Sequence, residues 1–253
     1  MTHYLADMTD VIRATDDDLA TVLSWLEAEY EEDGGTGFWC NRQVIEESHR
    51  ERDDLYVVRR DGEAVSFQVG EYAPSITSTR KDARGRGYAT ALLHAGIERA
   101  RRDDVNLLDI ECSPRESWEF WQKRGFERYG DMSQWGGITA RMVLPKRFDL
   151  PPGLPRAIVR VAFFSEDAKY REGIEPLADH VVEGAVLVEG ECQLPHRVIA
   201  IKDDCKRGDM VVQIEVDGRE IYRDKAKYPE ATAVGIMNDY RSGAFYIDKV
   251  LGA

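Results

Sequence analysis

The chain has 253 residues and a formal net charge of −13, because 47 Asp and Glu residues outnumber 34 Lys and Arg residues. This length can bury one large core or two ordinary ones, and no apolar run approaches the roughly 20 residues of a membrane-spanning helix. The excess of acid excludes an ordinary nucleic-acid-binding surface, which is basic, and favours cationic partners instead.

The N-terminus and the cysteines indicate the compartment. Residues 1–18 carry acids where a secretory signal has a basic stretch and an apolar core, so we expect a cytoplasmic protein. The four cysteines form no Cys-x-x-Cys pair, and the five histidines show no zinc-ligand spacing. We therefore expect free thiols and no metal site, with a disulfide between Cys192 and Cys205 as the alternative.

Residues 10–145 alternate between strand and helix patterns. Thr15, with Asp18 three positions later, predicts a helix start closed by a capping box. Asp61 and Gly62 between two apolar runs predict a β-hairpin. Helices are expected from Thr15 to a polar break at 29–37, and at 41–50, 88–102 and 114–124, the last ended by Gly125. Strands are expected at 11–13, 55–58, 64–69, 76–80, 105–112, 127–132 and 139–144.

The prolines and glycine of residues 146–155 mark a linker between a first domain at 1–145 and an accessory domain at 156–253. Turn signals at Asp217-Gly218 and Ser242-Gly243 separate short apolar runs in the accessory domain. They predict a mostly antiparallel β-sandwich or barrel-like domain. Its strands are expected at 157–164, 185–188, 197–202, 210–216, 220–224, 232–237 and 244–250.

The most informative stretch is residues 84–89, Arg-Gly-Arg-Gly-Tyr-Ala, between the expected strand at 76–80 and the expected helix at 88–102. Its glycines let backbone N–H groups approach an anion, and the helix dipole favours negative charge at the same point. Arg80, Lys81, Arg84 and Arg86 form a small basic patch in this acidic chain. The stretch therefore predicts a site for a phosphorylated ligand.

The order of elements and two motifs resemble the GNAT N-acetyltransferase superfamily over residues 10–145. Arg84, Gly87 and Ala89 match its loop Arg/Gln-x-x-Gly-x-Gly/Ala, and Gly125-Phe126 matches the Gly-Phe that ends a later short helix. The resemblance implies an α/β fold with a mixed central sheet flanked by helices, and acetyl-CoA as co-substrate. It assigns cofactor binding to Ser78, Thr79, Arg84, Gly85, Arg86, Gly87, Tyr88 and Ala89.

Two departures from that family concern proton transfer. Trp121 occupies the position of a tyrosine that many relatives use as an acid, and indole is no acid near neutral pH. The strand at 76–80 lacks the glutamate that serves as base. Glu111, Glu71 and a water chain remain as bases, with Glu111 the first choice. Ser117 is a candidate proton donor or cofactor contact, and Trp121 a candidate channel wall.

The predicted function is transfer of an acetyl group from acetyl-CoA to a primary amine, by direct attack in a ternary complex. The acceptor is expected to be a small molecule or a peptide, and neither nucleic acid nor membrane is expected as a partner. Residues 29–33 and Phe38-Trp39 lie where relatives often build the acceptor pocket. The alternative is a non-catalytic acyl-CoA-responsive protein whose β domain binds a peptide, carbohydrate or protein. A homodimer stays open.

Overall fold

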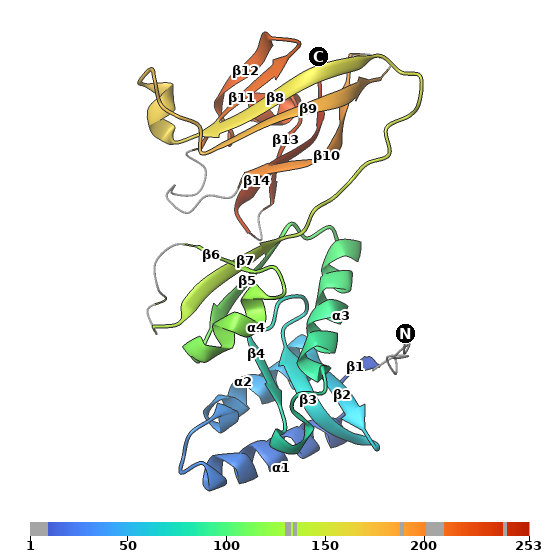
Figure 1. Ribbon diagram of the computed structural model, residues 1–253, viewed down its shortest axis with the longest axis vertical. Helices are drawn as coiled ribbons and strands as arrows, with labels where there is room; N and C mark the ends of the chain where they lie inside the picture. Colours follow the sequence, from blue (N-terminus) through green and yellow to red (C-terminus); the bar gives the residue numbers. More distant parts are fainter. Residues whose placement is uncertain are drawn as a thin grey trace, which may run out of the picture. The chain divides into compact units, whose positions relative to one another are not determined.

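The structure is a computed structural model that describes residues 10–129, 133, 136–187, 190–200, 210–239 and 242–252. Among the predicted features, Cys205 and the ends of the expected strands at 127–132, 185–188 and 197–202 lie outside these residues. The chain divides into two units, residues 1–142 and 143–253, which Figure 1 colours from blue to green and from yellow to red.

The first helix, α1 (Asp16–Glu32), begins with the predicted capping box. The Thr15 hydroxyl accepts a hydrogen bond from the Asp18 amide at 3.3 Å, and the Asp18 carboxylate accepts one from the Thr15 amide at 2.8 Å. Apolar residues spaced three or four apart then bury one stripe of the helix, as expected for a helix that packs on a sheet. They are Leu19, Val22 and Leu26.

Four antiparallel strands form the sheet that α1 covers, in the order β1-β2-β3-β4. Asp61 and Gly62 make the tight turn between β2 and β3 with φ of 55° and 88°, a conformation that this residue pair favours. The strands are β1 (Val11–Arg13), β2 (Leu55–Arg60), β3 (Glu63–Val69) and β4 (Ile76–Thr79).

Helices cover both faces of this sheet (Figure 1). Val57 and Phe67 pack in one cluster with α1 residues, whereas Tyr56 and Val58 point the other way and pack against Leu92 of α3 (Tyr88–Arg102). Ile45 of α2 (Arg42–Glu47) joins the α1 side, and a π-helical turn at Ser48–Arg52 follows it. The layered α/β arrangement predicted for this unit is confirmed.

A smaller sheet of three strands completes the first unit in the order β5-β7-β6, so that β4 and β5 belong to separate sheets. Its strands are β5 (Leu107–Cys112), β6 (Glu127–Arg128) and β7 (Ile138–Val143). Between β5 and β6 lie a 3₁₀ turn at Arg115–Ser117 and the short helix α4 (Trp118–Gln122). Gly125, with φ of 91°, follows this helix as predicted.

The second unit is built on one curled antiparallel sheet of seven strands, in the order β12-β11-β8-β9-β10-β14-β13 (Figure 1). Alternate residues of β8, from Ala157 to Phe163, are buried in the core inside the curl, which is the period expected of a strand with one buried face. The barrel-like form of the predicted β domain is therefore the one observed. The strands are β8 (Arg156–Phe164), β9 (Ala178–Val186), β10 (Cys192–Ala200), β11 (Val211–Val216), β12 (Arg219–Lys225), β13 (Ile236–Asp239) and β14 (Ala244–Val250).

Three predictions in this unit were wrong. The strand expected at 197–202 begins already at Cys192. The strand expected at 185–188 begins already at Ala178, because in β9 His180 points inward while Val181 is exposed, which hides the alternation. The strand expected at 232–237 is instead the helix α5 (Pro229–Ala233) followed by β13. Pro229 occupies the first turn of this helix, where proline is favoured because its missing N–H is not needed there.

Candidate functional site

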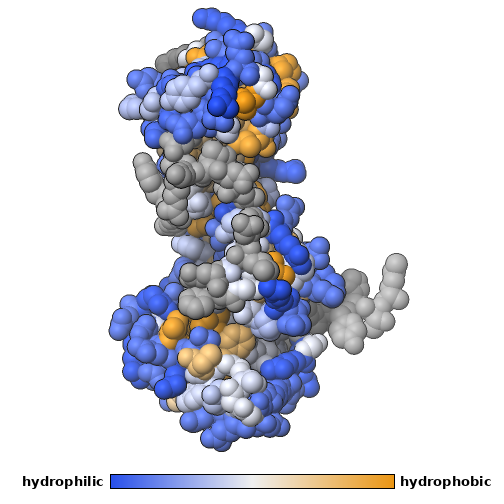
Figure 2. Space-filling model, turned by 90° about the vertical axis from the view of Figure 1, so that its left-hand side faces the viewer, coloured by the Kyte–Doolittle hydropathy of each residue, from blue (hydrophilic) through white to orange (hydrophobic). Residues whose placement is uncertain are grey.

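A cleft of about 680 Å³ lies along β4, residues 84–89, the first turn of α3 and α4. Every residue predicted to bind the cofactor lines it, together with Ser117 and Trp121. On the face of the first unit shown in Figure 2, apolar surface gathers in one area amid hydrophilic residues. The remaining lining residues are Phe38, Thr77, Ala83, Thr90, Pro114, Phe120 and Arg124.

The loop before α3 has the open backbone, accessible to an anion, that its two glycines predict. Gly85 and Gly87 have φ of 75° and 87°, a left-handed conformation that glycine adopts without strain, and a Cβ at either would meet no atom within 4 Å. No side chain of the described residues caps the N-terminus of α3, whereas α1 is closed by its own Thr15 and Asp18. The first-turn amides of α3 are therefore available to an anion in the cleft.

Two of the four basic residues near the loop, Arg80 and Lys81, form close ion pairs with acidic side chains. Arg80 donates to Asp82 at 2.8 Å and to Glu63 at 3.0 Å, and hydrogen bonds from Arg80 and Arg60 lower the pKa of Asp82 to about 2. The Lys81 ammonium contacts Glu32 and Asp33. Of the patch, only Arg84 and Arg86 line the cleft, and they add positive charge there together with Arg124.

β4 is the last strand of its sheet and lines the cleft, so its outer edge has no strand partner among the described residues. On its inner side, the Thr79 and Ser66 hydroxyls share a hydrogen bond of 2.8 Å, and the Thr77 hydroxyl donates to the Phe67 carbonyl at 2.9 Å. These bonds fix the strand against β3. Its free edge offers backbone N–H and C=O groups to an extended ligand.

The opposite wall is aromatic. Trp121 is only 6% exposed and packs edge-on against Phe120 and Phe126. Arg124 stacks over Phe120 at 3.4 Å and donates to the Thr90 hydroxyl of α3 at 2.5 Å, which ties the two walls together. Arg124 and Thr90 were not predicted as site residues, although Arg124 directly precedes Gly125-Phe126 in the sequence.

The candidate bases lie outside the residues that line this cleft. Glu111 accepts a hydrogen bond from the Ser133 hydroxyl at 2.5 Å, and Glu71 accepts one from the Tyr56 hydroxyl at 2.9 Å. Burial raises the pKa of the fully buried Cys112 thiol to about 11, which keeps it protonated and inert as a nucleophile. Ser117 lies in the cleft with its hydroxyl donating to the Pro114 carbonyl at 2.8 Å.

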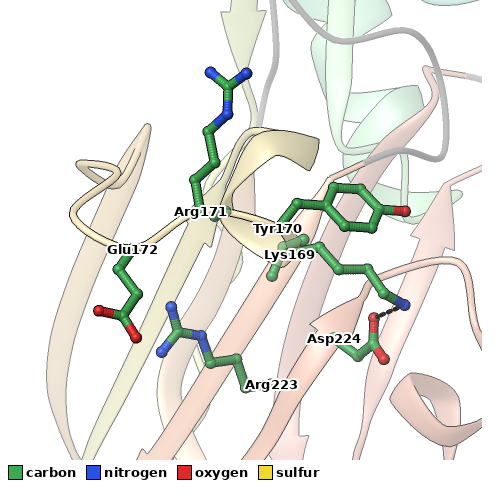
Figure 3. A pocket seen from close by; sticks show the side chains of 8 residues that line it. Lys169, Tyr170, Arg171, Glu172, Arg223 and Asp224 are labelled. Carbon is green, nitrogen blue, oxygen red and sulfur yellow. Dashed lines mark hydrogen bonds and ion pairs between the residues drawn. The ribbon is translucent and has the colours of Figure 1, made fainter.

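A separate hollow of about 470 Å³ lies in the second unit, and Figure 3 shows its charged side chains. Lys169 points toward Asp224 and donates to it at 2.7 Å, while Arg223 and Glu172 lie on the other side of the hollow. Tyr222 and Tyr228 of the same unit are half-buried, and burial raises the pKa of Tyr222 to about 12. Positively and negatively charged side chains both line this hollow, so its charge indicates no single class of ligand.

Among the described residues, no group of three or more His, Cys, Asp or Glu side chains could hold a metal ion. None of the helices in these residues has the length and apolar character needed to cross a membrane.

The family model described as acetyltransferase (GNAT) family matches residues 19–126, which include the loop, the cleft and Gly125-Phe126. No curated protein sequence matches the chain.

Solved structures similar to this one include the PaiA N-acetyltransferase of Thermoplasma acidophilum in complex with coenzyme A, at 11% identity and a TM-score of 0.42. That match covers 53% of this chain and 98% of the other. A ribosomal-protein-alanine N-acetyltransferase from Brucella melitensis matches at 23% identity and a TM-score of 0.40, over 53% and 99% of the two chains. On the match of the family model, the domain at residues 19–126 belongs to the acetyltransferase (GNAT) family.

Proposed function

We propose that the chain transfers an acetyl group from acetyl-CoA to a primary amine. The observation that carries this proposal is the uncapped N-terminus of α3, preceded by Gly85 and Gly87 and flanked by Arg84 and Arg86, in a cleft that extends to Trp121. Backbone amides and guanidinium groups together suit a pyrophosphate. The open space beside both glycines leaves room for it.

Different parts of the cleft bind different parts of the donor. The donor supplies an activated acetyl group as a thioester. The loop amides with Arg84 and Arg86 hold the phosphates, and the free edge of β4 holds the extended arm. A backbone N–H near Ser78 then donates to the carbonyl oxygen, where negative charge develops during attack. The amine nitrogen bonds to the acyl carbon, the carbon–sulfur bond breaks, and the amine's proton passes to a base.

Proton transfer is the part that this chain handles differently from many relatives. We propose Glu111 as the base, acting through water because it does not line the cleft. Trp121 cannot supply a proton, but a thiol of pKa about 8.5 leaves as a thiolate with little help from an acid. The Ser117 hydroxyl lines the cleft and would donate to the leaving sulfur by turning away from the Pro114 carbonyl.

Gly87→Glu tests the donor site. It places a carboxylate where the phosphates are proposed to bind, so we expect the Kd for acetyl-CoA in calorimetric titration to rise at least about tenfold, or 1.4 kcal/mol. Gly62→Glu is the matched control, since Gly62 also has a left-handed φ, at 88°, and open space beside it, but lies in the β2–β3 turn. Any strain or change of net charge is therefore shared.

Equal affinity for acetyl-CoA in the wild type and the Gly87→Glu variant would contradict the loop assignment. Acetyl-CoA binding by the wild type, with no acetylated product from any amine, would favour the non-catalytic acyl-CoA-responsive alternative. A product measured above the spontaneous rate rejects that alternative.

A further inference from the structure

A second cleft, of about 490 Å³, opens beside the proposed donor cleft within the first unit. Its walls come from the C-terminal half of α1, residues 36–41, β4 and residues 113–114. The two clefts have four lining residues in common, namely Phe38, Ser78, Arg84 and Pro114. A molecule in the second cleft can therefore reach the strand residue against which the proposed thioester lies.

The second cleft combines apolar walls with carboxylates. Leu26, Tyr30 and Phe38 supply apolar surface, and Glu29 and Asp33 are its acids. Arg84 is the one basic residue that lines it among the described residues. Such a lining suits an aliphatic chain that carries a positive charge at its far end.

The two acids differ in how firmly they are neutralised. Asp33 contacts the Lys81 ammonium at 2.7 Å, a cation that it shares with Glu32. Glu29 is 16% exposed, and one of its oxygens accepts a hydrogen bond from the Lys81 amide at 2.7 Å. Among the described residues, the one contact of its other oxygen is with an outer nitrogen of Arg84 at 3.4 Å, which is long for a charge-assisted hydrogen bond.

Arg84 also belongs to the donor loop, and this connects the two clefts. Its side chain is 57% exposed and is held at Nε by the Thr79 carbonyl at 3.0 Å, so its outer nitrogens can turn toward either cleft. A phosphate in the donor cleft attracts the guanidinium more strongly than the long contact to Glu29 does. Donor binding then leaves the half-buried Glu29 carboxylate without a cation, and a buried charge without a partner is costly.

We propose that the acceptor is an amine with a second positive charge at the end of an apolar linker, and that Glu29 binds this distal cation. This inference rests on the proposed function, because it takes the second cleft as the acceptor site of that reaction. The linker packs against Leu26, Tyr30 and Phe38, and the reacting amine lies at Ser78. Bound in this way, the acceptor restores the charge balance that donor binding removes.

Four five-carbon amines test the inference with the full chain and saturating acetyl-CoA. They are 1,5-diaminopentane, pentylamine, 5-aminopentanol and 5-aminopentanoate, which share the reacting amine and differ at the far end. A hydrogen bond to a charged group is worth about 1.5–3 kcal/mol, so we expect kcat/KM for the diamine to exceed that for pentylamine by roughly 10- to 100-fold. The carboxylate of 5-aminopentanoate should make it the poorest substrate.

Glu29→Gln should lower kcat/KM for the diamine at least about tenfold more than that for pentylamine, because only the diamine has a distal cation that contacts the Glu29 carboxylate. Glu27→Gln is the matched control, since Glu27 lies two residues earlier along α1, is exposed and does not line the cleft. It removes the same charge and should leave the ratio of the two substrates unchanged. The Kd for acetyl-CoA in each variant shows whether the donor loop is intact.

The outcomes separate this inference from the proposed function. If amines are acetylated but the diamine is no better than pentylamine, or if Glu29→Gln keeps the preference, the inference is wrong and the proposed function stands. The same holds if acetyl-CoA binds and a different amine, but none of these four, is acetylated. If acetyl-CoA does not bind, the proposed function is wrong and the inference falls with it.

Discussion

Asp18 illustrates how a single residue of this chain serves two structural purposes. It closes the capping box of α1 with Thr15, and both of its oxygens accept hydrogen bonds from Arg59 of β2, at 2.7 and 2.6 Å. Burial alone would raise the pKa of this carboxyl, which is 3% exposed, but the hydrogen bonds from Arg59 and Thr15 outweigh burial and hold the pKa below its ordinary value of 3.8.

Asp18→Asn should therefore lower stability in a pH-dependent way. A carboxyl whose pKa is lower in the folded state stabilises the protein at pH values above 3.8, its unfolded value, and this contribution is lost as the pH falls through the folded pKa. We expect the variant to unfold at lower urea concentration at pH 7, and the difference from wild type to shrink as the pH falls below about 4. The exposed Asp17→Asn should show little change. A difference that is constant with pH would contradict the assignment.

The residues that could be predicted at this scale are those whose signals are local. Thr15 and Asp18 are three positions apart, and the glycines of the loop act through their own backbone. Arg59 lies 41 positions from Asp18, and Thr90 lies 34 positions from Arg124, so no local sequence pattern predicts either hydrogen-bonded pair. Such contacts depend on which elements pack together.

Among the elements, α3 was predicted with its observed bounds because the loop glycine, the apolar spacing and the basic last turn all agree. The predictions for α5 and β9 were wrong because the sequence patterns of these two segments conflict with the structures they form. β-branched residues around α5 favour a strand, whereas Pro229 starts a helix. The order of the seven strands in the second unit could likewise not be predicted from the sequence, since strand pairing joins segments far apart in the chain.

Gly96 of α3 provides a test of packing between elements. Replacing glycine by alanine inside a helix usually stabilises it by about 1 kcal/mol. Here the added Cβ would overlap the Tyr72 carbonyl oxygen and lie 3.3 Å from the Gln68 amide nitrogen, so α3 would have to move away from its neighbours. We expect Gly96→Ala to lower the free energy of unfolding by about 1–3 kcal/mol, measured in urea.

Ala95→Gly, one position earlier in the same helix, is the comparison for Gly96→Ala. It removes a Cβ and should cost close to the helix-propensity difference of about 1 kcal/mol. The two exchanges are opposite in chemistry and should nevertheless both destabilise the protein. A Gly96→Ala variant that is as stable as the wild type would show that α3 is not held against Tyr72 as described.

At the scale of the whole molecule, the two units have separate hydrophobic clusters. The cluster around α1 and β1–β3 draws only on the first unit, and the cluster inside the curled sheet draws only on the second. All residues that line the proposed donor and acceptor clefts lie in the first unit. A ligand of these clefts is therefore expected to stabilise the first unit by mass action and to leave the second unit unchanged.

Tryptophan fluorescence makes that expectation measurable, because all five tryptophans lie before residue 143. Acetyl-CoA at 100 times its Kd should stabilise the first unit by about 2.7 kcal/mol and raise the Tm of the fluorescence transition by several degrees. Calorimetry should show a second transition that acetyl-CoA does not move. At the same acetyl-CoA concentration, a tenfold rise in Kd leaves about 1.4 kcal/mol of stabilisation, so Gly87→Glu should cut the fluorescence shift to about half or less, and Gly62→Glu should keep it. If acetyl-CoA instead moves both transitions equally, the units unfold as one, and the separation of their cores does not govern the stability of the chain.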